Sequence, residues 1–400
     1  MIRFVRELHL ERIINILLII QCIGIVWMTF LYARGDMFPA SVLLFINGGV
    51  FIWKYGNVSY AFETILSRLF LIFVFIEALA FGNYLFDDSK NTRFLGGLFY
   101  NTSLFEFFCY SLVWYLNYLF FYIYTKKSDS VILLKIFVIL YFVAGILNNY
   151  RAHMTFHVQN GDLSQINYFY YALIPLPLLF YFVNNKLKYI FLVFALLCVI
   201  YGYKRSGIFA CGLIFIVNFF IDSSKSIKSF LLNCFLTLII IFVSSYYVGN
   251  NKAIERTQTR LERLDSDGGS GRTKNIENII ERVKTAPTVN QIFGYGFMGH
   301  AAKYHKMVDV EVFAILYYYG IVGWFVYIVI HIWLIRKICY LYRIRDVIGS
   351  NVLSSYSTCY SILIFYSIAA EPFSYLFFFC LIFVYLGFIE AYLNEHYNIV

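Results

Sequence analysis

Arginine residues are concentrated in one long polar stretch of the sequence, residues 250–309. From Asn250 to Val308, this stretch carries ten Lys and Arg residues against six Asp and Glu residues, a surplus of four positive charges. A guanidinium group binds phosphate oxygens through two parallel hydrogen bonds. The stretch is therefore predicted to be a docking surface for an anionic substrate. Its arginines are Arg256, Arg260, Arg263, Arg272 and Arg282.

Two further arginines lie between apolar segments outside this stretch. Arg205 belongs to Lys204-Arg205-Ser206-Gly207, and Arg151 lies close in sequence to His153 and His157. Such cations can simply anchor lipid headgroups, but a guanidinium is also suited to phosphate. We favour the phosphate role for Arg205 and keep Arg151 as a second candidate.

Groups that could act as a general base lie where the polar stretch returns to apolar sequence. They are His300, His305 and Asp309. A base at this place could take the proton of a sugar hydroxyl at the membrane surface. The alternative for each is a polar residue near the start of a helix, and Asp309 is suited to be an N-cap.

Metal chemistry is not favoured by the sequence. Asp265-Ser266-Asp267 looks like the Asp-x-Asp motif that holds a metal and a nucleotide sugar in soluble glycosyltransferases, but two glycines follow it, which favours a turn and a helix start. The eight cysteines are scattered through apolar segments with no Cys-x-x-Cys pair, so neither a zinc site nor a disulfide framework is predicted. We expect no metal and no cofactor.

The rest of the chain is too apolar for a soluble protein. Of its 400 residues, 61% are hydrophobic and 14% are charged, whereas soluble domains have about 25% charged residues. Because about 20 apolar residues cross a bilayer, we predict an all-α polytopic membrane protein with about twelve spans. The predicted spans are residues 13–32, 38–53, 65–86, 98–122, 131–147, 166–183, 189–203, 207–221, 230–248, 310–335, 352–370 and 374–393.

The loop cations predict an orientation in the membrane. Fourteen Lys and Arg residues flank the spans on one side and six lie in short loops on the other, which places both termini in the cytoplasm. The first span lacks a small-residue cleavage site, so we predict a membrane span that stays in the protein and not a signal peptide that is removed. The chain then divides into spans 1–9 (1–249), an outer loop (250–309) and spans 10–12 (310–400). Cations placed in this way favour lipid partners and not nucleic acid.

The elements that must position the arginines are two helices in the outer loop. In residues 252–264, Lys252, Arg256, Arg260 and Arg263 recur every three or four residues and share one helical face. That face either contacts lipid headgroups or contacts substrate. A second helix is predicted to start near Ser270, a good N-cap. Arg272 lies on the same face as its apolar stripe, which is Ile276, Ile279, Ile280 and Val283.

Other residues inside the spans have structural or functional alternatives. Pro175 and Pro177 are predicted to kink the sixth span, which membrane helices tolerate. Glu77 and Glu106 fall inside predicted spans, where carboxylates are rare. They could form the proton relay of a transporter or a structural polar pair, and we favour the structural role.

Read in order, these features resemble the superfamily of O-antigen polymerases (Wzy-type) and O-antigen ligases, which are bacterial membrane glycosyltransferases. The resemblance covers residues 204–323. Its motifs are Arg205-Ser206, the long outer loop, Ser270-Gly271-Arg272, Pro287, Phe293-Gly294-Tyr295-Gly296, and the run from Asp309 to Tyr319-Gly320-Ile321-Val322-Gly323. Ligases typically carry His-Asn about eleven residues before the last Gly-x-x-Gly, whereas this chain has Asp309-Val310. This departure favours a polymerase. An aromatic residue often follows the loop arginine by one turn, and here that position is Ile276.

The resemblance implies a GT-C-like fold and metal-independent, inverting glycosyl transfer at the periplasmic face of the inner membrane. The substrate would be an oligosaccharide linked to undecaprenyl pyrophosphate, and a chain-length regulator is a candidate partner that the sequence does not identify. Arg272 and Arg205 would then bind the pyrophosphate, with Arg256, Arg260 and Arg151 in support. Asp309 would be the base, with His305 or His300 as substitutes. Tyr295, Tyr304 and residues 317–319 could stack on sugar rings.

Three functions are therefore kept open. The first is a surface polysaccharide polymerase, which passes the growing glycan to a new lipid-linked repeat unit. The second is an O-antigen ligase, with the same chemistry and a lipid A–core acceptor. The third belongs to another class and is a flippase or transporter of lipid-linked glycans, against which the few membrane-embedded charges argue.

Overall fold

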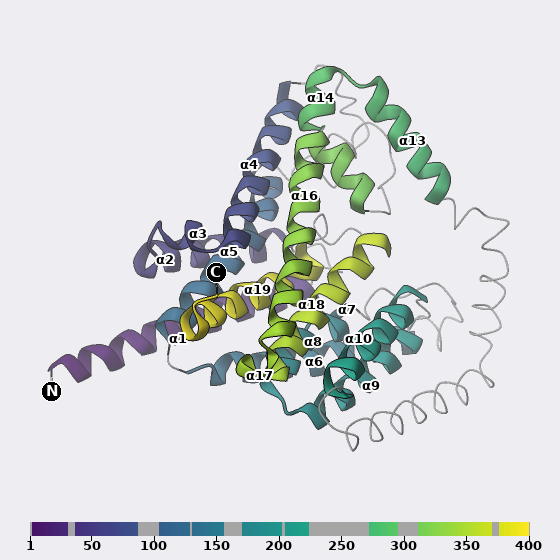
Figure 1. The fold of residues 1–400 in the computed structure, drawn as a ribbon. Coiled ribbons are helices and arrows are strands. Elements are labelled where there is room, and N and C mark those ends of the chain that lie inside the picture. The colour runs from purple at the N-terminus through teal and green to yellow at the C-terminus, as the bar shows by residue number, and fades with distance from the viewer. Residues whose placement is uncertain are drawn as a thin grey trace. The chain divides into compact units, whose positions relative to one another are not determined.

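A computed structural model describes residues 2–30, 37–86, 104–128, 130–155, 170–201, 205–223, 272–294, 311–369 and 376–399. Every regular element in these ranges is a helix (Figure 1). The prediction of an all-α protein is confirmed for this part of the chain.

Apolar helices occupy the predicted spans, apart from span 230–248, which lies outside the described residues, and the sixth span is divided into two short helices. Apolar runs of this length favour helices, because a helix satisfies its backbone groups within the segment itself, without water. The helices are α1 (Ile2–Phe30), α2 (Met37–Tyr55), α4 (Ile65–Phe86), α5 (Leu104–Lys127), α6 (Ile132–His153), α7 (Tyr170–Leu173), α8 (Leu176–Phe182), α9 (Asn185–Tyr201), α10 (Arg205–Ser223), α16 (Glu311–Arg343), α18 (Ser350–Ala369) and α19 (Leu376–Tyr397). The short helices are α3 (Tyr60–Glu63), α13 (Arg272–Thr285), α14 (Thr288–Phe293) and α17 (Arg345–Ile348).

Two of the described helices are long and apolar enough to cross a membrane, namely Ile132–His153 and the Val312–Arg343 part of α16. Their length and composition agree with a membrane location. Shorter apolar helices lie in four other segments of the described chain. The total of twelve crossings stays a prediction.

The predicted proline kink in the sixth span is confirmed. Helix α7 ends at Leu173 and α8 begins at Leu176, so the break falls at Ile174 and Pro175. Proline lacks the backbone N–H that would continue the helical ladder, and its ring crowds the preceding turn. Leu179 N–H still donates to the carbonyl of Pro175 (3.0 Å), so the helix resumes at once.

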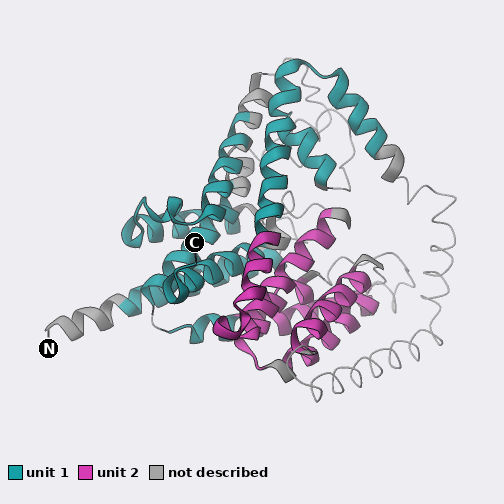
Figure 2. Ribbon diagram, in the orientation of Figure 1, with its two compact units in different colours: residues 1–137, 276–334, 370–400 teal, residues 138–275, 335–369 magenta. Residues whose placement is uncertain are grey.

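The helices group into two compact units, which Figure 2 colours teal and magenta. The first contains residues 1–137, 276–334 and 370–400, and the second contains residues 138–275 and 335–369. In the first unit, α5 packs against α2, α4 and α19. The backbones of α5 and α19 approach closely where Gly387 of α19 faces Tyr118 of α5. A Cβ atom on Gly387 would lie only 2.1 Å from the carbonyl oxygen of Tyr118, so a side chain there would not fit.

A polar cluster lies at one end of α5 in the first unit. Lys126 forms an ion pair with Glu63, and its ammonium lies 5.2 Å from the ring centroid of Tyr122. Asn394 on α19 donates hydrogen bonds to the Glu63 carboxylate (2.9 Å) and to the Tyr122 hydroxyl (2.9 Å). Between membrane helices, such directional bonds replace part of the hydrophobic driving force that operates in water. The cluster therefore ties α3, α5 and α19 together.

The second unit is built around α10, α18, α8 and α9, and it contains a buried ion pair between Lys188 and Asp222. The sequence interpretation counted Lys188 among the cations at a membrane edge. The structure buries its side chain inside the second unit, which leaves its place relative to the membrane a prediction. The long Lys stem packs in the core, and the carboxylate of Asp222, 34 residues later, supplies a countercharge that the local sequence pattern does not reveal.

Candidate functional site

The two glycine motifs of the sequence meet in a backbone crossing. Gly294 follows the last residue of α14 with φ 76° and ψ −174°, and Gly320 interrupts α16 with φ 66° and ψ −169°. Only glycine adopts this region of backbone space readily. A Cβ atom on Gly294 would lie 2.1 Å from the carbonyl oxygen of Tyr318, and one on Gly320 would lie 2.3 Å from that of Ile292. We call the contact of residues 292–294 with residues 318–320 the glycine crossing.

The break at Gly320 corrects the sequence interpretation, which placed one uninterrupted span at residues 310–335. Glycine is common within membrane helices, so Gly320 alone was not read as a break. The positive φ is required because the end of α14 approaches α16 at this point, which is a tertiary effect. Helix α14 itself was also missed, although Pro287 directly before it is a helix-start signal.

A hydrogen-bonded corner joins α14 to α13. The side-chain amide of Gln291 donates to the carbonyl oxygens of Lys284 (3.1 Å) and Ala286 (2.9 Å). The last carbonyls of a helix have no partner within it, so these bonds satisfy groups that α13 leaves open. The corner fixes α13 next to the glycine crossing, and Figure 1 shows α13 and α14 as consecutive helices beside α16.

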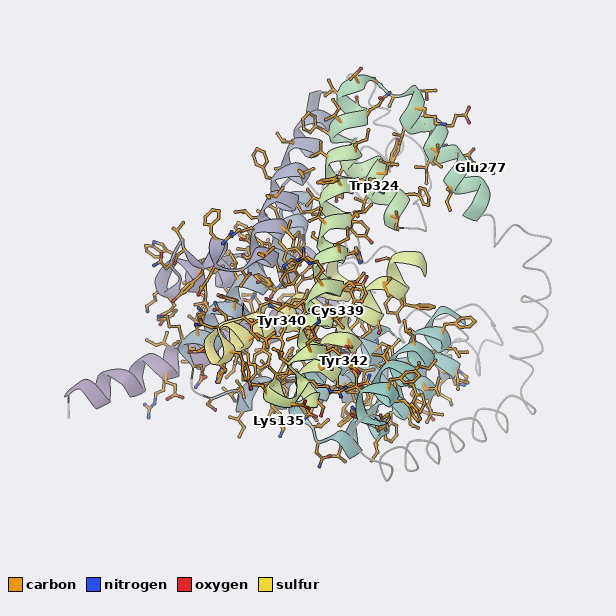
Figure 3. The ribbon with its side chains drawn as sticks, in the orientation of Figure 1. Lys135, Glu277, Trp324, Cys339, Tyr340 and Tyr342 are labelled. Atoms are coloured by element: carbon orange, nitrogen blue, oxygen red, sulfur yellow. The ribbon has the colours of Figure 1, made fainter. Side chains whose placement is uncertain are left out.

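Helix α13 confirms the second predicted helix of the loop. It begins at Arg272, two residues after the predicted start near Ser270. Within its apolar stripe Ile279 is 3% exposed, whereas Glu277, which Figure 3 labels, is exposed on another face. Arg272 precedes Ile276 by four residues, so the helical register places it in line with the stripe.

Arg205 and Arg272 occupy equivalent places in their helices, since each is the first described residue, of α10 and α13 respectively. The first backbone N–H groups of a helix lack carbonyl partners and attract anions. Both of the leading arginine candidates therefore stand where the backbone favours a negative charge.

Arg151 is exposed in the last turn of α6. A cation at this end of a helix is stabilised by the helix dipole. This position supports the structural alternative for Arg151 as much as a role in binding.

Tyrosines 317–319 are not available for the sugar stacking that the sequence suggested. They are 1%, 0% and 2% exposed. Tyr319 lies against Phe73 of α4, with ring centroids 5.1 Å apart, and Phe73 in turn contacts Trp114 at 6.2 Å. These rings pack the glycine crossing against α4 and α5. Large apolar faces next to the break explain their burial.

Several candidate residues lie outside the described part of the chain. They are Asp309, His300, His305, Arg256, Arg260 and Tyr295, together with the helix predicted at residues 252–264 and the Asp265-Ser266-Asp267 turn. Helix α16 begins at Glu311, two residues after Asp309. Among the described residues, no group of three His, Cys, Asp or Glu side chains is placed to hold a metal ion.

Comparison with known families gives one match, to the family described as O-antigen ligase like membrane protein, over residues 249–350. The matched segment includes Arg256, Arg260, Arg272, both glycines of the crossing and Asp309, and it leaves out Arg151 and Arg205. No curated protein sequence matches the chain. The family match supports the O-antigen polymerase and ligase superfamily, and it does not distinguish a polymerase from a ligase.

Proposed function

We propose that this protein is a surface polysaccharide polymerase of the O-antigen type, acting at the outer face of the inner membrane. The observation that carries the proposal is the matched segment itself. Within residues 249–350, an arginine opens helix α13, and a hydrogen-bonded corner joins α13 to the glycine crossing with α16. The match supports a membrane enzyme that assembles surface glycan. The polymerase assignment rests on Asp309-Val310, where ligases typically carry His-Asn.

The proposed reaction transfers the growing glycan from undecaprenyl pyrophosphate to a new lipid-linked repeat unit. The acceptor hydroxyl oxygen bonds to the anomeric carbon, while the bond from that carbon to the pyrophosphate oxygen breaks. The hydroxyl proton passes to a base, and undecaprenyl pyrophosphate leaves with the bonding electron pair. In-line attack inverts the anomeric configuration. No redox partner is needed.

The leaving pyrophosphate gains negative charge as the bond breaks, so the site must supply fixed positive charge. We assign this role to Arg272 and Arg205, with Arg256, Arg260 and Arg151 in support. Preorganised donors at a site shielded from water stabilise such a charge strongly. The free N–H groups at the starts of α10 and α13 would add to the guanidinium charge at both positions. Tyr295 is proposed to stack on a sugar ring.

The function is tested by deleting the gene in its host and separating the surface glycan on a gel. Loss of a polymerase leaves the core with a single repeat unit, and loss of a ligase leaves bare core with lipid-linked polymer accumulating. Loss of a flippase traps repeat units on the cytoplasmic side. Only the first pattern supports the proposal, and unchanged long-chain glycan would remove the chain from this pathway altogether.

The ligase is the second candidate, because the matched family is described as ligase-like. A ligase would use the same arginines on the same leaving group, and it would differ in the acceptor. Lipid A–core as the acceptor would give the bare-core pattern in the deletion experiment.

Asp309→Asn is expected to slow polymer formation by about 10²- to 10⁴-fold, the usual contribution of a general base. The amide keeps the size of the side chain and can still accept a hydrogen bond, but it cannot take the proton. The rate is measured in host membrane vesicles with their own lipid-linked units. A fall of only a few fold would reduce Asp309 to an N-cap and move the base to His305 or His300.

Arg205→Ala is expected to remove long-chain glycan while the protein stays in the membrane at its normal amount. Its side chain would otherwise neutralise part of the pyrophosphate charge, and a single such donor is commonly worth about 10²- to 10³-fold in rate. Gel analysis of the glycan, with immunoblots of the membrane fraction, measures both quantities. If Arg205→Ala keeps full chain length, Arg205 has no role in leaving-group binding.

A further inference from the structure

Helix α10 carries the proposed pyrophosphate ligand Arg205 at its first residue and a buried polar cluster near its last. The cluster consists of Lys188 and Tyr189 on α9, Asn218 and Asp222 on α10, and Ser354 and Thr358 on α18, and we call it the Lys188 cluster. Asn218 lies 13 residues from Arg205, which corresponds to ~20 Å along a helix. All of these residues belong to the second compact unit.

Charged and polar groups of the cluster pair with one another across three helices, and the Oδ1 atom of Asp222 is left buried without a hydrogen-bond partner. Lys188 Nζ lies 2.7 Å from Asp222 Oδ2, and it donates to Ser354 Oγ at 3.0 Å. The hydroxyl of Tyr189 donates to the same Asp222 oxygen at 2.8 Å. All of these side chains are buried. An isolated charge at this place would be unfavourable, so the pairing explains how the interior of the protein contains it.

Asn218 makes the direct link between α10 and α18. Its Nδ2 donates to Thr358 Oγ1 (3.0 Å) and to the carbonyl of Ile214 in its own helix (2.8 Å). Its Oδ1 accepts a hydrogen bond from Ser354 and lies 3.5 Å from Lys188 Nζ. The amide therefore contacts both other helices of the cluster, and each bond has a preferred direction.

The remainder of the buried stripe on α10 is made of small or apolar residues. These residues are Gly207, Ala210, Cys211, Ile214 and Ile221. Asn218 and Asp222 are the polar residues of the same buried stripe. Small apolar surfaces let helices approach closely but have no directional bonds that fix their axial register. A slip by one turn would move the helix 5.4 Å. Within this stripe, Asn218 and Asp222 supply the directional side-chain bonds from α10 to α18 and α9.

We propose that Asn218, supported by the rest of the Lys188 cluster, is a positioning residue for Arg205. This inference rests on the proposed function, in which Arg205 binds the leaving pyrophosphate. A helix transmits axial and rotational shifts along its length, and an error of about 1 Å at a reacting group can lower a rate about 10²-fold. Losing the Asn218 bonds thus weakens the reaction through Arg205 and not through a contact with substrate.

Asn218→Leu tests the inference, because leucine has the same branched arrangement of side-chain heavy atoms, makes no hydrogen bonds and removes neither Lys188 nor Asp222. Polymer formation in host membrane vesicles is expected to slow by about 10- to 100-fold, within the range that misplacement produces. Ser361→Ala is the matched control. Ser361 is also buried on α18, but its hydroxyl donates to Ser357 of the same helix (2.8 Å). The rate of this control is expected to stay within about twofold, since its hydrogen bond sets no interhelical register. If Asn218→Leu fails to accumulate, Thr358→Val removes one bond of the cluster with less disturbance.

A double-mutant cycle separates positioning from general stability. In a chain that already carries Arg205→Lys, Asn218→Leu is expected to slow the reaction less than about twofold, because the group that it positions has already been replaced. If Asn218→Leu slows the reaction equally with Arg or with Lys at position 205, the role of Asn218 is purely structural. If Asn218→Leu slows the reaction in neither background, Asn218 has no role. Either result overturns the inference. If Arg205→Ala itself leaves the rate unchanged, the proposed role of Arg205 in pyrophosphate binding is wrong, and that result is distinct from a failure of the Asn218 inference alone.

Discussion

Replacing Arg272 by alanine is expected to abolish long-chain surface glycan and to leave the protein in the membrane at its normal amount. Arg272 opens α13 within the segment that matches the ligase-like family. Its guanidinium would face a pyrophosphate whose charge grows in the transition state, where a preorganised donor contributes about 10²- to 10³-fold to the rate. Polymerisation repeats this step at every repeat unit, so the gel pattern should collapse to core plus one unit.

Two further variants of α13 sharpen this result. Arg272→Lys keeps the positive charge but loses the planar two-point contact, so it should yield shortened chains and not a wild-type ladder. Lys284→Ala removes an exposed cation from the last turn of the same helix and should change nothing. Full chain length in Arg272→Ala, or equal losses in the Arg272 and Lys284 variants, would be incompatible with leaving-group binding at the start of α13.

Gly320→Ala is expected to destabilise the protein and to remove the glycan ladder. An alanine there would hold an unfavourable backbone conformation, at about 1–3 kcal/mol. Its Cβ would also stand 2.3 Å from the carbonyl oxygen of Ile292, and overpacking of this kind commonly adds about 1–3 kcal/mol. The thermal midpoint of the detergent-solubilised protein should fall, and the corner that holds α13 should shift with it.

Two other glycines divide the Gly320 effect into its parts. Gly349 also has a positive φ (81°) but has open space around it, so Gly349→Ala should show the backbone contribution alone. Gly49 lies inside α2 with open space and no unusual φ, and alanine there should be neutral or slightly stabilising. A Gly320→Ala midpoint equal to that of Gly349→Ala would mean that the close approach of α14 does not matter.

Periodicity and length were enough to predict most of the described helices. The apolar runs, the break at Pro175 and the start of α13 near Ser270 all follow from local chemistry, because each depends on residues next to one another in the chain. The registers agree as well, since Ile279 is buried as the stripe predicted.

Features that depend on distant partners could not be predicted. The break at Gly320 exists because Gly294 approaches it, and the sequence around either glycine gives no sign of this contact. The burial of Lys188 could not be predicted, because nothing near it in the sequence points to Asp222 as its partner. Tyr319 was assigned to sugar stacking on residue type alone, whereas Phe73 covers its ring in the core.

The glycine crossing also bears on how this segment can vary. Gly294 and Gly320 hold the two ends of the intervening chain together by backbone contact, independently of the side chains between them. The entropy of closing such a loop grows only with the logarithm of its length. A change in the length of the chain between the two glycines is therefore expected to cost little loop-closure entropy, because their contact depends on the two backbone segments alone.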